Sequence, residues 1–95
     1  MFIVSLTYVV PLDEVDAMLA QHRSFLEKQY AAGTFLASGA KVPRTGGIIL
    51  AKAESEAALR DVLAEDPFHL HNLAYYDIQE FTPSRTAVGL ETLKG

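Results

Sequence analysis

The sequence contains no cysteine and no tryptophan among its 95 residues. Without cysteine there can be no disulfide, no thiol nucleophile, and no zinc or iron–sulfur centre held by cysteine. The same absence occurs in proteins of many compartments, so it identifies none of them. Its consequence is chemical: several classes of covalent and metal site are excluded.

Basic residues and long apolar runs are also scarce. Eight scattered Lys and Arg residues oppose twelve Asp and Glu, which gives a formal net charge of −4. An acidic chain without a basic cluster is a poor partner for nucleic acid or for an anionic membrane surface. No apolar run approaches the roughly 18 residues that span a bilayer, and no basic segment with a following apolar stretch opens the sequence. We therefore expect a cytoplasmic protein with neither nucleic acid nor membrane as a partner.

Length and composition indicate a folded chain. Apolar residues make up 49% and charged residues 21% of the sequence, which is typical of globular domains. A chain of this length forms one domain with a modest core, and no repeat or linker divides it. We expect a single domain over residues 1–95, with a folded core in residues 1–83. Residues 84–95 then form a C-terminal tail with the apolar side chains Val88, Leu90 and Leu93.

Four segments are rich in β-branched or aromatic residues, which favours strands. Residues 43–46 have turn composition, so the second and third of these segments should form a hairpin. The four predicted strands cover residues 2–10, 35–42, 46–51 and 73–81.

Two helices separate these strands. Asp13 is a suitable N-cap for the first helix, which Gly33 should end about twenty residues later. Ser55 is a suitable N-cap for the second helix. Pro67 disfavours helical geometry at Asp66, so Asp66 is predicted to lie at the end of that helix.

The order β-α-β-β-α-β predicts an α+β, ferredoxin-like fold, in which two helices cover one face of a four-stranded antiparallel sheet. Two helices cannot cover both faces. Because the first strand is largely apolar on both sides, we expect the open face to pack against a second copy of the chain in a symmetric homodimer. The alternative is a monomer whose tail covers that face.

His22 and Asp66 are the residues best suited to chemistry. His22 lies within the apolar stripe of the first helix, and Asp66 continues the inward face of the second, three residues after Leu63. An imidazole can take up and return a proton, and a carboxylate on its other nitrogen would fix its tautomer. The alternative is a core histidine bonded to backbone, with Asp66 capping its own turn.

Four short motifs occur in order along the chain: residues 22–26 (HRSFL), 38–39 (SG), 66–68 (DPF) and 76–81 (YDIQEF). Together they resemble the YciI-like (YCII-related) family of the dimeric α/β-barrel group. The family commonly has proline where this chain has Ala40, and often glycine where it has Asn72, which tolerates a left-handed backbone. The resemblance implies a fold similar to that of muconolactone isomerases and a His22–Asp66 active-site pair, but no single reaction.

Several residues are candidates for binding a small molecule. The Ser38 hydroxyl could donate to a ligand where Gly39 leaves room for close approach, and Arg44 in the turn could bind an anion. Strand packing for Ser38 and an exposed turn position for Arg44 are the alternatives. Aromatic walls for a planar ligand, or simply core residues, are Tyr8, Tyr30, Phe35 and Phe68.

His69 and His71 raise the question of a metal site with His22. Their i, i+2 spacing places them on one face only in an extended segment, so we expect a solvated turn and no metal. No glycine-rich phosphate loop or dinucleotide fingerprint is present, and we expect no cofactor.

Three functions fit these features. One is a cofactor-independent enzyme that moves protons on a small organic molecule, such as a cyclic or aromatic one, through His22 and Asp66. A second is a non-catalytic module that binds such a molecule. A third is a dimeric assembly module in which both residues only pack.

Overall fold

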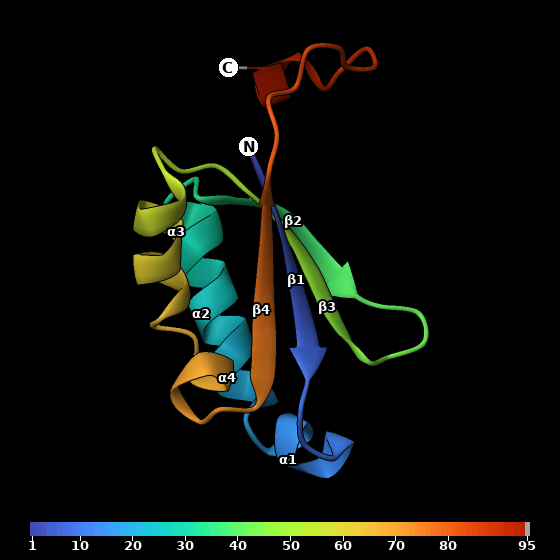
Figure 1. Ribbon diagram of the computed structural model, residues 1–95, viewed down its shortest axis with the longest axis vertical. Helices are drawn as coiled ribbons and strands as arrows, with labels where there is room; N and C mark the ends of the chain where they lie inside the picture. The colour runs from blue at the N-terminus through green and yellow to red at the C-terminus, as the bar shows by residue number, and fades with distance from the viewer. Residues whose placement is uncertain (95) are drawn as a thin grey trace.

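The computed structural model describes residues 1–94 and contains four strands in one antiparallel sheet, in the order β2-β3-β1-β4 (Figure 1). Central β1 pairs antiparallel with β3 and with β4, and β2 pairs antiparallel with β3. The predicted ferredoxin-like fold is confirmed, although three strands are shorter than predicted. The strands are β1 (Phe2–Tyr8), β2 (Phe35–Ala40), β3 (Gly46–Ala51) and β4 (Ala74–Glu80).

The first predicted helix is two helices, α1 (Leu12–Ala17) and α2 (Leu19–Ala31). They are interrupted at Met18, whose φ of −107° and ψ of 6° leave the helical region. Asp13 is not the N-cap, because Pro11 occupies that position and Asp13 lies in the first turn. Its carboxylate still meets the positive end of the helix dipole there. Gly33 follows α2 with φ +79°, which confirms it as the left-handed stop.

The second predicted helix also ends earlier than expected. Ser55 is its N-cap, as predicted, and the Ser55 hydroxyl accepts from the Ala58 N–H at 3.1 Å. However, α3 (Glu56–Leu63) stops before Asp66, so the prediction that Asp66 ends this helix is wrong. Asp66 instead caps the start of a further short helix, α4 (Pro67–Leu70). Proline at the first helical position explains the new start, because its fixed φ suits a helix and its missing N–H is not needed there.

Helices α2, α3 and α4 lie on one face of the sheet, which we call the covered face, and α1 lies beyond the end of β1 (Figure 1). Phe2, Val4 and Leu6 of β1 point into it and are at most 2% exposed. The intervening side chains of β1 point to the opposite face, because side chains alternate along a strand. On this open face, Ile3 lies opposite Leu50, and Ser5 opposite Ile48.

The C-terminal tail leaves the sheet after β4. Figure 1 shows it extending beyond the end of the strands, with a short 3₁₀ helix, η1 (Glu91–Lys94), near its end. Val88 is 98% and Leu90 50% exposed, so these residues do not cover the open face of the sheet. Gly95, the last residue of the predicted tail, lies outside the described residues. None of the helices in residues 1–94 is long and apolar enough to cross a membrane.

Candidate active site

His22 and Asp66 are in direct contact. His22 Nδ1 lies 2.8 Å from Asp66 Oδ1, although the residues are 44 positions apart in the sequence. The His22 side chain is 11% exposed and the Asp66 side chain is fully buried. A carboxylate can only accept at this distance, so Nδ1 carries the proton and Nε2 is the other, free nitrogen of the ring. The predicted contact exists, whereas its catalytic role stays a prediction.

Asp66 receives two further hydrogen bonds. The Phe68 N–H donates to Oδ1 at 3.0 Å, and the Tyr76 hydroxyl donates to Oδ2 at 2.5 Å. Asp66 therefore caps its own helix and orients His22 at the same time. Burial and the Asp66 carboxylate raise the pKa of Tyr76, so its hydroxyl keeps its proton and remains a donor.

The plane of the His22 ring is fixed by Phe68. The two rings stack with centroids 3.9 Å apart and planes 4° from parallel. Tyr8 meets the Phe68 ring edge-on at 5.9 Å. Since α4 carries Phe68 and is itself capped by Asp66, one short helix positions both the stacking ring and the carboxylate.

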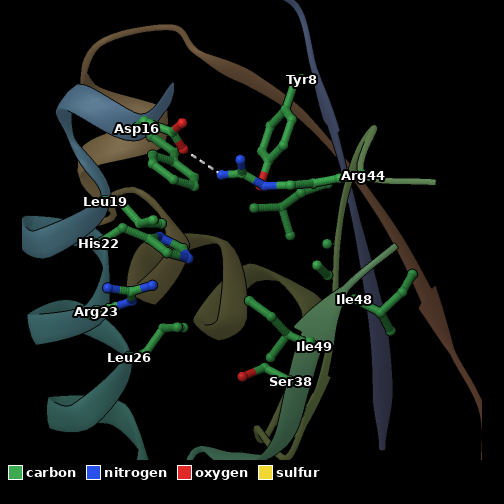
Figure 2. Close-up of a pocket in the computed structure, with 15 residues that line it drawn as sticks. Tyr8, Asp16, Leu19, His22, Arg23, Leu26, Ser38, Arg44, Ile48 and Ile49 are labelled. Carbon is green, nitrogen blue, oxygen red and sulfur yellow. Dashed lines mark hydrogen bonds and ion pairs between the residues drawn. The ribbon is translucent and has the colours of Figure 1, made fainter. Parts of the chain in front are cut away.

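A cavity of about 380 Å³ lies between α2 and the sheet, on the covered face (Figure 2). Its lining includes His22 and five of the candidate binding residues, whereas Asp66 lies behind His22, and Tyr30 and Phe35 lie outside the lining. His22 Nε2 has no hydrogen-bond partner within residues 1–94. The lining comprises Leu6, Tyr8, Asp16, Leu19, His22, Arg23, Leu26, Ser38, Gly39, Ala40, Arg44, Gly47, Ile48, Ile49 and Phe68.

An ion pair lies at one side of this cavity. Arg44 Nη2 is 2.5 Å from Asp16 Oδ1, which links the β2–β3 turn to α1 (Figure 2). The hydrogen bond to Arg44 lowers the pKa of Asp16, and the same bond raises the pKa of Arg44. Arg44 therefore lines the cavity, but its guanidinium already has an acidic partner, and its binding of an anion stays a prediction.

The remaining predicted residues divide between cavity and core. The Ser38 Oγ lines the cavity and is 2.5 Å from the Tyr30 hydroxyl. Tyr30 thus orients Ser38 without lining the cavity itself. Phe35 is 2% exposed and packs edge-on against Phe25 at 5.7 Å, so it belongs to the core.

The sequence did not indicate three residues that matter here. Tyr76 appeared only within a motif, and its bond to Asp66 depends on β4 lying beside β1. Asp16 lies in α1, and an acidic residue near a helix start gives no signal of an ion pair with a distant turn. Arg23 follows His22 directly, and this adjacency was the available signal for a second polar group at the cavity.

His69 and His71 follow Asp66 but do not approach His22 as a metal site. His71 is the C-cap of α4, and the His69 ring meets Tyr76 edge-on at 5.8 Å. In the described part of the chain, no three His, Asp or Glu side chains form a group that could hold a metal ion.

The YCII-related domain model matches residues 1–82 of the sequence. The chain belongs to this family. The match ends one residue before the predicted end of the folded core. Asn72, where the family often has glycine, has φ +55°, so it adopts the left-handed conformation for which it is suited.

A solved structure shares the fold of this YCII-related domain. It is 5-chloro-2-hydroxyhydroquinone dehydrochlorinase (TftG) from Burkholderia phenoliruptrix AC1100, in complex with 2,5-dihydroxybenzoquinone. The TM-score is 0.71 at 19% sequence identity, and the alignment covers 85% of this chain and 93% of the other. A search of functionally curated proteins gave no significant match.

Proposed function

We propose that this YCII-related protein is a cofactor-independent enzyme that transfers protons on a small cyclic organic molecule, with His22 as the acid–base residue. The observation that carries the proposal is the His22–Asp66 contact of 2.8 Å at the wall of a cavity. With Nδ1 held by Asp66, Nε2 is free to take a proton from a bound molecule. A core histidine would have both nitrogens satisfied within the fold.

Each neighbour of His22 has a distinct task in this mechanism. Asp66 stabilises the imidazolium that forms when Nε2 accepts a proton, as carboxylate partners of catalytic histidines do. Phe68 holds the plane of the imidazole, and Tyr76 holds the carboxylate. The protonated ring can then return the proton to another atom of the same molecule, which completes an isomerisation.

Elimination is the second reaction that this arrangement fits. The structural neighbour TftG is a dehydrochlorinase, and its ligand is a hydroxylated quinone. In such a reaction His22 would accept the proton while chloride leaves with the bonding electrons, so that HCl is lost in total. Tyr8, Ser38, Gly39, Phe68 and Arg44 are the residues that we assign to substrate binding.

The test is turnover by His22→Asn. The wild-type protein is incubated with chlorinated hydroxyhydroquinones, and chloride release and product mass are followed. We expect the variant to lose at least about 100-fold in rate, since general acid–base catalysis contributes about that much. His71→Asn is the matched control, because His71 is exposed and does not line the cavity.

Unchanged turnover in His22→Asn would refute the proposal. Saturable binding without any product would favour the alternative, a module that holds a small molecule for another protein. That alternative uses the same cavity but needs no free nitrogen at His22.

We further propose that the open face of the sheet binds a second copy of the chain. The face carries the exposed apolar side chains Ile3, Ile48 and Tyr75, which are 39%, 39% and 63% exposed. The tail does not cover them, and exposed apolar side chains on one face of a sheet favour association. A symmetric homodimer is the simplest assembly that covers one such face. A cytoplasmic location stays a prediction.

A further inference from the structure

The lining of the cavity carries more positive than negative charge. Its lining contains two cations, Arg23 and Arg44, and one carboxylate, Asp16. Asp16 is paired with Arg44 at 2.5 Å. Arg23 has no ion pair and no side-chain hydrogen bond with any residue from 1 to 94. One positive charge therefore faces the cavity in a chain whose formal net charge is −4.

Asp66 does not neutralise that charge at the cavity surface. Its side chain is fully buried behind the His22 ring, and three donors are directed at its two oxygens. Hydrogen bonds to a carboxylate stabilise its negative charge where it lies. The Asp66 carboxylate is thus committed to His22, Phe68 and Tyr76, and only the imidazole is presented to a ligand.

Arg23 lies beside His22 on the same helix. Figure 2 shows its side chain next to the imidazole, on the α2 side of the cavity. Apolar walls surround this position: Leu19 and Leu26 lie along the same helix, and Ile49 lies across from them on β3 (Figure 2). A flat apolar body fits between such walls, and its charged edge would meet the guanidinium.

We propose that the cavity selects planar cyclic molecules that carry a single negative charge, and that Arg23 binds the anionic oxygen. This inference deepens the proposed function, because it names the substrate class of the same site. A planar guanidinium can donate two parallel hydrogen bonds to a carboxylate or an enolate edge. Binding the anion at Arg23 places the ring of the ligand next to His22, where a proton can be exchanged.

Arg44 is the less suitable of the two cations for this role. Binding an anion there requires either the loss of the Asp16 contact or an anion beside the Asp16 carboxylate. Arg23 makes no ion pair or hydrogen bond among the described residues, and its positive charge is only the last of the causes that lower the pKa of Asp16, after the contact with Arg44. Arg23 on α2 is therefore the residue that selects an anionic ligand, whereas Arg44 joins the turn to α1 at the edge of the cavity.

The test compares two probes of matched shape, benzoate and benzamide, which differ by one charge. Dissociation constants are measured by NMR titration of the wild-type protein and of Arg23→Gln. We expect the wild type to bind benzoate about tenfold more tightly than benzamide, a difference of about 1.4 kcal/mol. Arg23→Gln should abolish this preference and leave benzamide binding unchanged.

Two further variants make the outcome specific. Arg23→Lys keeps the positive charge and should retain part of the preference for benzoate. Lys28→Gln removes a cation from the same helix outside the cavity lining and should retain all of it. Equal affinities for both probes in the wild type, no benzoate binding, or a preference that persists in Arg23→Gln would overturn the inference. Turnover is not measured here, so failure of this inference is distinct from failure of the proposed His22 chemistry.

Discussion

Tyr75 and Tyr76 are neighbours in β4 with opposite environments. Tyr76 points to the covered face, where its hydroxyl donates to Asp66 at 2.5 Å. Tyr75 points to the open face and is 63% exposed. In β3 the same contrast separates Ile49, 3% exposed, from Ile48, 39% exposed.

Because side chains alternate in direction along each strand, the two faces of the sheet have different roles. Side chains on the covered face pack the core, line the cavity and hold the His22–Asp66 pair. Those on the open face contribute little to the fold of one chain and are available for association. The two faces are therefore expected to respond differently to the same substitution, because burial determines its cost.

The largest difference is expected between Ile49→Ala and Ile48→Ala. Ile49→Ala should lower the free energy of unfolding by about 3 kcal/mol, since removing a buried isoleucine leaves a cavity. Ile48→Ala should lower it by about 1 kcal/mol or less in dilute protein. Urea unfolding at low concentration measures both. Equal losses would show that the open face is packed as tightly as the covered face within one chain.

A charge placed on the open face should break the dimer. Ile48→Lys is expected to raise the dimer dissociation constant at least about 100-fold, because an unpaired charge would be buried in the interface. Sedimentation equilibrium gives the constant. Ala57→Lys adds the same charge to the exposed surface of α3 and should leave the assembly unchanged. A wild-type protein that sediments as a monomer would refute the proposed dimer.

Much of this arrangement could be predicted from the sequence, because it depends on local patterns. Strand composition gave the order of elements, and Ser55 marked the start of α3. Helical spacing correctly pointed His22 inward, whereas the inward direction of Asp66 was inferred from a helix that in fact ends at Leu63. Asp66 nevertheless lies at a different place in the backbone than predicted, as the N-cap of α4.

The unpredicted features depend on contacts between distant segments. The Asp16–Arg44 pair spans 28 residues and forms only when the β2–β3 turn folds toward α1. The Tyr76–Asp66 bond requires the register between β4 and β1 that turns Tyr76 to the covered face. Neither register nor turn direction is encoded by composition, so these partners became visible only in the structure.

Alkaline pH should distinguish the two tyrosines of β4. Burial and Asp66 raise the pKa of Tyr76 above its ordinary value of 10.0. The unfolded chain releases this proton near that pH while the folded chain keeps it. The contribution to stability is therefore complete below about pH 10 and is lost as the pH rises further.

Tyr76→Phe should remove this part of the pH dependence. Above about pH 10, the free energy of unfolding should fall less steeply with pH in the variant than in the wild type. The difference between the two slopes should be about 1.4 kcal/mol per pH unit. Tyr75→Phe, one residue away on the open face, should retain the wild-type slope. Urea unfolding at a series of alkaline pH values measures all three proteins. An unchanged slope in Tyr76→Phe would contradict the buried hydrogen bond to Asp66.

The smallest effect is expected from deleting the tail, residues 84–95. Val88 is 98% exposed and Leu90 50% exposed, so deletion removes little buried apolar surface. The free energy of unfolding should change by less than about 0.5 kcal/mol, as for other exposed termini. The dimer dissociation constant should also stay the same, because Ile3, Ile48 and Tyr75 remain in place. A loss of more than about 2 kcal/mol, or dissociation of the dimer, would show that the tail covers the open face or clasps the second copy.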